Sequence, residues 1–381
     1  MSELSVRTQV LALASVVFVD LLGLAIILPS LPFFVLHLGG SGLALGAILT
    51  SYSLAQMAAA PVLGRLSDRY GRRGLLLLSL AGSTASFALS ALAPTVTLLI
   101  VARVLAGLCG GSITVAYAFA ADITTSEDRR SAMGRIGAGI GLAFTVGPAI
   151  GAALAPLGFA SVCWAGAAVT AANLVAAWRV LPHPSGPEHP TPRPPSPRAE
   201  RPRLLIVLVL GGAVVTGAFV SMETTVGLLV DARYRYGPSG VGWLLALAGL
   251  SMVLAQIGIG LRRARQVPDR IVALGSMTLV AAGLAAIPVA WAPGTVLGVL
   301  LLSAAYGAFT VTQASLISRS GPPTSTGVRL GWSQSANAAG RACGPLGAGL
   351  LYDLHADLPY LVAAVATAVM ATLLAGAERS N

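Results

Sequence analysis

Residues 64–73 read Gly-Arg-Leu-Ser-Asp-Arg-Tyr-Gly-Arg-Arg, a polar block between two apolar stretches that are each long enough to cross a bilayer. A short turn with four arginines cannot lie in hydrocarbon, so it marks a surface that faces water. An excess of arginine in short loops is typical of the cytoplasmic side of a membrane. The block therefore predicts a membrane protein and also gives its orientation.

The composition points the same way. Of 381 residues, 55% are hydrophobic and only 10% are charged, and the mean hydropathy is +0.81. Soluble domains carry about 25% charged residues, so this chain is too apolar to be solvated on all sides. The net charge of +10 comes from arginines scattered in short loops, and they form no contiguous basic face that could follow a phosphate backbone. The composition therefore predicts an integral membrane protein and excludes nucleic acid as a partner.

A helix needs roughly 20 apolar residues to span a bilayer, and the chain offers about twelve such segments. They predict an all-α integral membrane fold. The candidate spans are 10–36, 43–63, 75–93, 96–121, 132–157, 160–181, 204–230, 241–261, 271–291, 295–317, 328–352 and 358–375.

Alternating the spans across the membrane separates the arginines. One side receives Arg7, the 64–73 block, Arg129, Arg130, Arg262, Arg263, Arg265, Arg270, Arg319 and Arg379. The other side keeps only Arg233 and Arg235. This asymmetry predicts that both termini lie in the cytoplasm.

A proline-rich polar segment, residues 182–203, divides the chain into an N-terminal bundle of six helices (1–181) and a C-terminal bundle of six (204–381). Its composition predicts an extended cytoplasmic linker, and its Pro-x-x-Pro pattern leaves a docking peptide as the alternative. Residues 51–56 (SYSLAQ) are echoed two hundred positions later by residues 251–256 (SMVLAQ). We therefore expect two pseudo-symmetric bundles with a cavity at their interface.

Asp20 is the only charged residue deep in the first span, about ten residues or roughly 15 Å of helix from its cytoplasmic end. An ionised carboxyl group in hydrocarbon is costly, so an acidic residue there indicates a functional site by default. We predict that Asp20 carries a proton, with a structural ion pair as the alternative. Pro29 and Pro32 follow it and predict a kink near the outer end of the span.

Arg103 is the only basic residue inside the fourth span, where Gly107 and Gly111 continue its helix face. A buried guanidinium needs an acidic or carbonyl partner. We predict that Arg103 modulates Asp20, and an architectural ion pair remains the alternative.

The fifth span combines a bendable Gly-Pro step with small residues, and the eleventh span repeats the step. These residues predict hinges, and the simpler interpretation is a helix-packing seam. The residues are Gly139, Gly147, Pro148, Gly151, Gly344 and Pro345.

Glu223 lies in the seventh span and corresponds by the internal offset to Gly23, one turn beyond Asp20. We predict a shared role in proton coupling, and a hydrated position near the outer interface is the alternative. Other polar residues in the spans are candidates for the substrate cavity, although each could equally form an interhelical hydrogen bond. They are Tyr52, Gln56, Tyr117, Gln256, Tyr306, Gln313, Gln334 and Asn337.

The 64–73 block matches the loop between the second and third helices of major facilitator transporters at Gly64, Asp68, Arg69, Gly71, Arg72 and Arg73. In that family the loop holds the two halves together as a conformational latch, an acid in the first helix is protonated, and an arginine in the fourth tunes it. The fifth-span motif resembles the antiporter motif of its exporters. Residues 121–134 resemble the loop after the fourth helix in tetracycline-efflux-like members. The ninth span departs from them, since it has no acidic residue where tetracycline exporters carry one.

The resemblance implies a twelve-helix drug:proton antiporter in a bacterial inner membrane, a monomer that exports a small amphipathic compound in exchange for protons. The alternatives are a proton-coupled importer, a sugar or metabolite exporter, and a non-transporting receptor. The sequence has no Gly-x-x-x-x-Gly-Lys motif, no lysine and no catalytic motif, so we expect neither ATP hydrolysis nor an enzyme nor a cofactor. The three cysteines lie in apolar segments without metal-ligand spacing, so no metal is expected.

Overall fold

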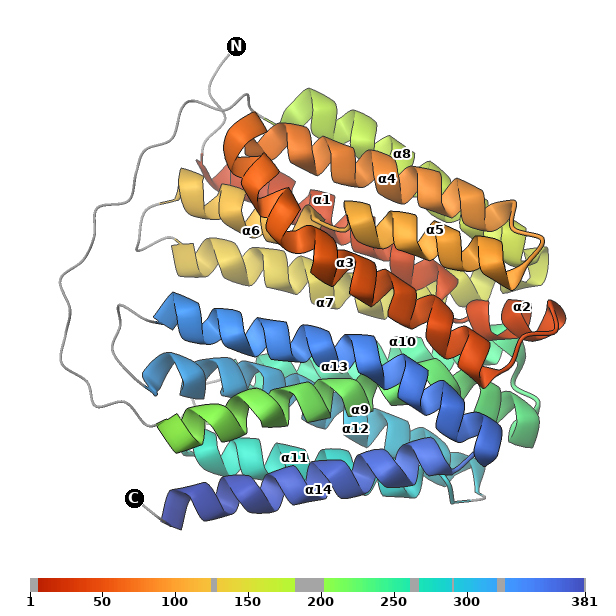
Figure 1. Ribbon diagram of the computed structural model, residues 1–381, viewed down its shortest axis with the longest axis vertical. Helices are drawn as coiled ribbons and strands as arrows, with labels where there is room; N and C mark the ends of the chain where they lie inside the picture. Colours follow the sequence, from red (N-terminus) through yellow and green to blue (C-terminus); the bar gives the residue numbers. More distant parts are fainter. Residues whose placement is uncertain are drawn as a thin grey trace. The chain divides into compact units, whose positions relative to one another are not determined.

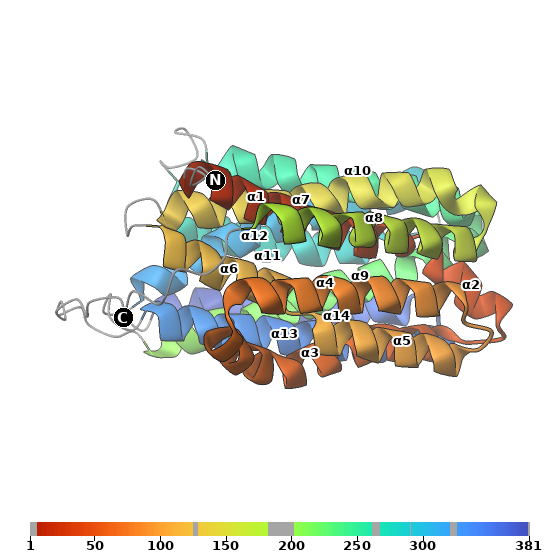
Figure 2. The same ribbon diagram turned by 90° about the horizontal axis from the view of Figure 1, so that it is seen from above.

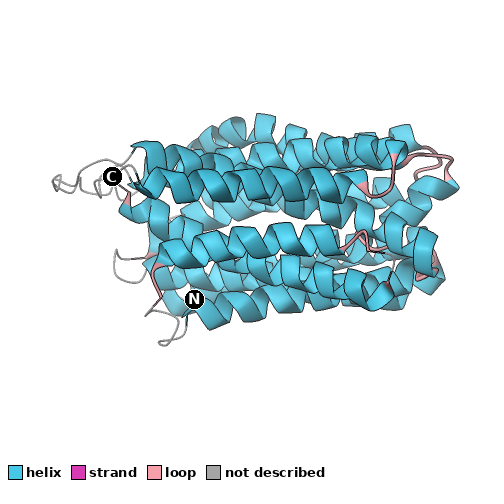
Figure 3. Ribbon diagram, turned by 90° about the horizontal axis from the view of Figure 1, so that it is seen from below, coloured by secondary structure: helices cyan, strands magenta, loops and turns pink. Residues whose placement is uncertain are grey.

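The computed structural model describes residues 6–124, 129–181, 202–260, 267–289, 291–320 and 326–379. Helices make up nearly all of these residues and no strand occurs among them (Figures 1 and 3). The all-α prediction is therefore confirmed. The helices are α1 (Val6–Ile27), α2 (Leu31–His37), α3 (Gly42–Tyr70), α4 (Arg72–Ala91), α5 (Val96–Cys109), α6 (Ser112–Ile123), α7 (Arg129–Leu154), the 3₁₀ turn η1 (Ala155–Leu157), α8 (Phe159–Val180), α9 (Pro202–Tyr234), α10 (Gly237–Gly260), α11 (Asp269–Ala286), α12 (Ala292–Arg319), α13 (Thr326–Leu354) and α14 (Leu358–Arg379).

Twelve membrane spans are consistent with these helices, although two predicted spans are each divided. The first span breaks between α1 and α2, next to Pro29, as the predicted kink requires. The fourth breaks between α5 and α6 at Gly110 and Gly111, so its prediction as one continuous helix is wrong. Paired glycines cost helix stability and leave backbone groups open to other partners.

Among the described residues, ten helices are long and apolar enough to cross a membrane. The two divided halves α5 and α6 are too short to qualify, and α13 is too polar. The chain is thus a multi-pass membrane protein. The predicted linker lies almost wholly outside the described residues, except that Pro202 and Arg203 already belong to α9. The predicted domain boundaries stay a prediction.

The 64–73 block is less of a loop than the sequence predicts. Helix α3 continues to Tyr70, a single residue (Gly71) connects it to α4, and α4 begins at Arg72. Gly71 has φ = 89°, a left-handed conformation that glycine adopts without strain. Charged residues support a helix where it leaves hydrocarbon, so the polar block extends the helix instead of ending it.

The chain forms two compact units, and two helices contribute to both. Unit 1 contains residues 1–40, 51–190 and 236–246, and unit 2 contains residues 41–50, 191–235 and 247–381. In unit 1, α1 packs along α7 and α8, and α4 packs along α8 and α5 (Figures 1 and 2). In unit 2, α9 packs along α13 and α14, and α11 packs along α12 and α14.

Glycines allow the closest helix contacts in each unit. A Cβ atom on Gly147 of α7 would lie 2.3 Å from the Cβ of Ala25, and one on Gly151 would lie 2.2 Å from the carbonyl oxygen of Ile26. In unit 2, a Cβ on Gly340 of α13 would lie 2.2 Å from the carbonyl oxygen of Ala213. Any side chain at these positions would push the helices apart, so α1–α7 and α9–α13 are tight seams of the same kind.

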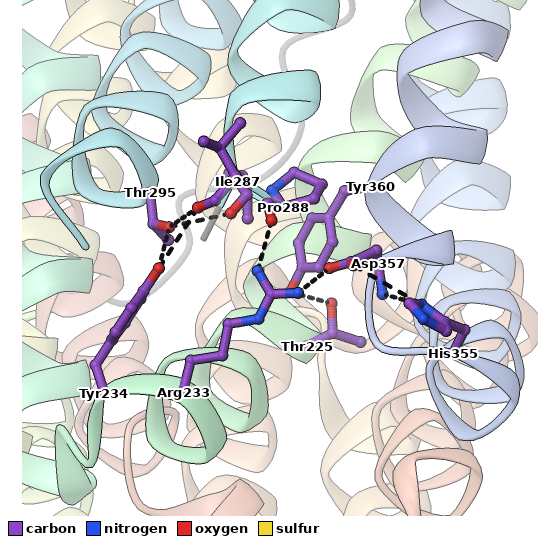
Figure 4. A network of polar contacts seen from close by, with 10 residues as sticks. Thr225, Arg233, Tyr234, Ile287, Pro288, Thr295, His355, Asp357 and Tyr360 are labelled. Carbon is purple, nitrogen blue, oxygen red and sulfur yellow. Dashed lines mark hydrogen bonds and ion pairs between the residues drawn. The ribbon is translucent and has the colours of Figure 1, made fainter. Parts of the chain in front are cut away.

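A polar network in unit 2 explains why Arg233 departs from the arginine asymmetry (Figure 4). Its guanidinium donates to the carbonyl oxygen of Pro288 at 2.6 Å and forms an ion pair with Asp357. Nearby, Thr225 donates to the hydroxyl of Tyr360 at 3.0 Å. The Arg233 guanidinium at this end of the unit therefore has both an acidic and a carbonyl partner.

Candidate functional site

Asp20 lies inside unit 1, where three helices meet around it. Its side chain is 9% exposed on α1. The hydroxyl of Ser112, the first residue of α6, donates to its Oδ2 at 2.6 Å, and the Ser83 side chain of α4 lies nearby. Its Oδ1 is buried and has no hydrogen-bond partner. The carboxyl group is therefore half satisfied, with one oxygen available for another contact.

Arg103 is buried still more deeply, on α5, with 2% of the residue exposed. Its guanidinium carbon lies 5.9 Å from the centre of the Phe87 ring, within the range of a cation–π interaction. The Nε and Nη2 atoms are buried and have no hydrogen-bond partner. A buried cation with open donors is costly, so Arg103 is poised to bind a carboxylate, a carbonyl group or water.

Asp20 and Arg103 line the same cavity of unit 1, with a volume of about 30 Å³. Such a volume holds about one or two water molecules. Tyr52 and Gln56 of α3 also line it, and their predicted role in a substrate cavity stays a prediction. Within the described ranges no ion pair joins Asp20 to Arg103. Asp20 and Arg103 therefore line the same cavity, but no direct bond joins the carboxyl group to the guanidinium.

The break between α5 and α6 helps to build this cavity. Gln56 donates its side-chain amide to the carbonyl oxygen of Gly110 at 2.8 Å and to the hydroxyl of Tyr52 at 3.2 Å. The same break places Ser112 at the start of α6, where its side chain reaches Asp20. Gly110 and Gly111 therefore shape the site by interrupting the helix.

Among the lining residues that sequence reasoning missed, those with a hydroxyl group or an aromatic ring are Ser83, Ser86, Phe87 and Ser112. Serines at i and i+3 on α4 share a helix face, which was the available signal for Ser83 and Ser86. Ser86 donates to the carbonyl oxygen of Ala102 at 2.8 Å and so fixes α5 against α4. No sequence pattern pointed to Ser112, because its position depends on the helix break.

Unit 2 contains a second polar cluster, which is more open than the first. Phe219 of α9 and Tyr306 of α12 stack with ring centres 4.2 Å apart and planes 8° apart. The Tyr306 hydroxyl lies near Thr216 and within electrostatic range of Glu223 on α9 and Arg341 on α13. All four of the cluster's side chains, on Phe219, Glu223, Tyr306 and Arg341, are half-buried. The predicted sites at Glu223 and Tyr306 are therefore neighbours.

Two other predicted cavity residues are tied up in packing. Gln313 and Asn337 are buried, and the amide of Gln313 donates to the carbonyl oxygen of Leu208 at 2.8 Å. A Cβ on Gly212 would lie 1.9 Å from that amide nitrogen and 2.6 Å from the Asn337 side-chain oxygen. For Gln313 the structure supports the interhelical hydrogen bond over cavity lining. Gln256 lies half-buried on α10, Gln334 is exposed on α13, and the side chain of Tyr117 lies outside the described residues.

The predicted latch and hinges are described only in part. Arg73 donates to the carbonyl oxygen of Trp178 at the end of α8, and Arg72 begins α4. The side chains of Asp68 and Arg69, and the surroundings of Gly64, lie outside the described residues. The latch therefore stays a prediction.

Helices α7 and α13 run through their prolines, Pro148 and Pro345, without ending. Gly139 also faces α1, with its Cβ position 2.9 Å from the carbonyl oxygen of Ala14. A Cβ on Gly344 would lie 2.8 Å from the carbonyl oxygen of Gly217. The structure shows these residues as packing seams, and the hinge role stays a prediction.

The chain was compared with known protein families, proteins and structures. A family profile described as Major Facilitator Superfamily matches residues 13–232. The tetracycline resistance protein, class C, of Escherichia coli is 34% identical over 172 residues, which cover 44% of this chain and 43% of that protein. The match to that relative thus spans less than half of its length.

Two further matches extend over most of the chain. Major facilitator superfamily domain-containing protein 10 of Bos taurus is 29% identical over 338 residues, or 81% of this chain and 73% of that protein. The crystal structure of the human organic anion transporter MFSD10 (TETRAN) has a TM-score of 0.72 at 24% identity and covers 98% of this chain and 100% of that one. The family profile covers more than half of the chain, which therefore belongs to the Major Facilitator Superfamily.

Proposed function

We propose that the protein exports a small amphipathic compound in exchange for protons, by alternating access. The observation that carries the proposal is the cavity in unit 1 that Asp20 and Arg103 line together without an ion pair. A carboxyl group without a fixed counter-ion can gain and lose a proton, whereas a locked ion pair cannot. The resistance proteins among the relatives support the direction of transport.

The environment of Asp20 opposes and supports its charge at the same time. Burial in an apolar helix bundle disfavours the carboxylate, whereas the hydroxyl groups of Ser112 and Ser83 favour it. The Arg103 guanidinium favours the carboxylate more strongly as the two groups approach. A small change in the separation of α1 and α5 therefore shifts proton occupancy, and this links the conformation to proton binding.

Several expectations about the setting belong to the same proposal. The protein would act as a monomer in a bacterial inner membrane, with both termini in the cytoplasm. The arginine asymmetry of the sequence supports this orientation. The block at residues 64–73 would then lie on the cytoplasmic side, where a latch between conformations is useful.

Transport of an organic anion is the second candidate. The relative that matches 81% of this chain is a protein of the MFSD10 type, and the human MFSD10 structure is described as an organic anion transporter. The absence of an acidic residue from the ninth predicted span also favours a substrate other than tetracycline.

Export is tested in two stages. A panel of amphipathic compounds that includes tetracycline is first screened for loss of susceptibility when an efflux-deficient bacterium expresses the protein. Everted membrane vesicles then report whether addition of an active compound dissipates a pre-formed pH gradient. We expect Asp20→Asn to abolish this proton movement, because an amide cannot carry the proton, while compound exchange without a gradient continues.

The control is Thr278→Val, since Thr278 is exposed and bonds only within its own helix. It should match the wild-type protein in both assays. Undiminished proton-driven export by Asp20→Asn would remove Asp20 from the mechanism. Gradient-driven uptake in place of export would show that the protein is an importer.

A further inference from the structure

We propose that Phe219, Glu223, Tyr306 and Arg341 of unit 2, the zwitterion cluster, bind the transported compound and select an aromatic molecule that carries both a positive and a negative group. The inference rests on the proposed transport function and names its substrate class. It gives Glu223 a role in recognition, whereas the sequence alone assigns it to proton coupling.

The aromatic part of the cluster is a preformed flat surface. The Phe219 and Tyr306 rings are nearly parallel, with centres 4.2 Å apart, and both remain half-buried. The Thr216 side chain lies near the Tyr306 hydroxyl. Stacked rings of this kind bind a further planar ring through contact area and quadrupole interactions, with little loss of side-chain entropy.

The charged part of the cluster is uncompensated. In the stretch of chain that the structure describes, neither Glu223 nor Arg341 forms an ion pair or a hydrogen bond. Both nevertheless act electrostatically on the same tyrosine hydroxyl, Tyr306, from two different helices. Two opposite charges thus lie beside one aromatic surface without neutralising each other.

This arrangement favours a ligand with both charges. Half-buried ions are only partly solvated, so each gains from a counter-charge that the ligand supplies. An anion would satisfy Arg341 and leave Glu223 open, and a cation would do the reverse. A zwitterion pairs with both and adds no net charge to a low-dielectric site, so neither charge of the cluster is left unpaired.

Contacts between helices α9 and α13 hold the residues of the zwitterion cluster in place. Arg341 follows Gly340, whose α-carbon lies in the tight α9–α13 seam, and Ser221 of α9 donates to the carbonyl oxygen of Gly344 at 3.2 Å. These contacts fix α13 against the helix that carries Phe219 and Glu223. Recognition residues on packed helices are held more firmly than residues on loops.

Three dyes with one xanthene core test the charge requirement. Rhodamine B is a zwitterion, its ethyl ester is a cation, and fluorescein is an anion. Fluorescence polarisation measures their Kd values for the full-length protein in lipid nanodiscs at one pH. We expect rhodamine B to bind at least about tenfold more tightly than the other two, since each counter-charge contributes a difference of this order.

Single substitutions then assign the charges. Arg341→Gln should weaken rhodamine B to the level of its ester and leave the ester unchanged. Glu223→Gln should weaken rhodamine B and the ester but not fluorescein. Thr278→Val is the control, because Thr278 is exposed and bonds only within its own helix, so the affinities and the preference among the dyes should remain. Arg341→Lys keeps a positive charge and should retain most of the discrimination, which covers the case in which Arg341→Gln does not fold.

Equal binding of the three dyes by the wild-type protein would overturn the proposal. An equal loss for all three dyes in Arg341→Gln, with the fold intact by size-exclusion chromatography, would also overturn it. Asp20→Asn protein serves to separate the two proposals, because its dye preference should be unchanged. A clear dye preference in a protein without proton-driven export would refute the proposed function alone.

Discussion

The two polar clusters of this transporter both contain an acid and an arginine, yet they differ in how they are enclosed. In unit 1, Asp20 and Arg103 are buried around a cavity of about 30 Å³, which is too small for anything beyond one or two waters. In unit 2, Glu223 and Arg341 are half-buried beside a pair of stacked rings. A small cavity lined by a buried acid suits a proton, and a less deeply buried cluster with an aromatic surface suits an organic compound.

The difference begins in the surrounding helices. The α5–α6 break places the Ser112 hydroxyl at Asp20 and leaves the carbonyl oxygen of Gly110 to accept from Gln56, so small polar groups line the cavity. The corresponding stretch of unit 2 is the unbroken helix α12, which presents the bulky Tyr306 side chain instead. Two bundles that resemble each other in sequence can thus take on separate tasks through one helix break.

Conservative replacement of each arginine should give the largest contrast. Arg103→Lys keeps the charge but loses the Nε and Nη2 donors that face the closed cavity, and a lysine cannot reproduce the planar guanidinium over Phe87. We expect about a hundredfold slower proton-driven export, equivalent to roughly 2.7 kcal/mol. Arg341→Lys should change the Kd for rhodamine B by less than about threefold, because a site in partial contact with solvent tolerates a point charge.

Vesicle export and dye polarisation measure the two effects on matched samples. If Arg103→Lys exports at the wild-type rate, Arg103 acts only as a point charge, and the contrast between the closed and open sites is lost.

Replacing a glycine by alanine in each unit should give the next largest effect. The two substitutions compare a glycine in a tight helix seam with one that has open space beside it. The Cβ of Gly147→Ala would lie 2.3 Å from that of Ala25, so α7 and α1 must separate. We expect a loss of about 1–3 kcal/mol, typical of overpacking. Gly347→Ala on α13 meets nothing within 4 Å and should be neutral or stabilise by up to about 1 kcal/mol through helix propensity.

Thermal unfolding in one detergent compares the two glycine variants directly. Equal melting temperatures would show that the α1–α7 seam relaxes freely, and the hinge hypothesis for Gly147 and Pro148 would then gain over the packing interpretation.

Removing one hydroxyl from each cluster should have the smallest effects, of different kinds. Ser112→Ala removes a donor to the Asp20 carboxylate, so the charged form is less favoured and the proton leaves only at higher pH. The pH of half-maximal export should rise by up to about one unit, with dye binding unchanged. Thr216→Val removes the hydroxyl of a side chain near the Tyr306 hydroxyl and should weaken rhodamine B by about threefold at every pH.

A pH profile of export and a dye titration for both variants complete the test. A shift of the pH profile by Thr216→Val, or a loss of dye affinity in Ser112→Ala, would contradict the division of tasks between the clusters.

Much of the fold and part of the site could be predicted before the structure. Apolar spans of about twenty residues must be helices in a bilayer, because their backbone groups have no other partners. A lone carboxyl group in the first span and a lone guanidinium in the fourth were conspicuous, because ionised side chains are costly in hydrocarbon. By contrast, Gln313 satisfied the same pattern and is a packing residue, since polar residues in apolar helices serve both purposes.

The sequence by itself determined the helices, the membrane setting, the family and the charged residues to examine. Those features follow from composition and local pattern, which act along the chain. Only the tertiary structure decided that Asp20 and Arg103 share a cavity without bonding, that Ser112 reaches Asp20, and that Arg341 joins Glu223 at Tyr306. These relations depend on helix rotation and on one break between two glycines, and both are set by packing between distant segments.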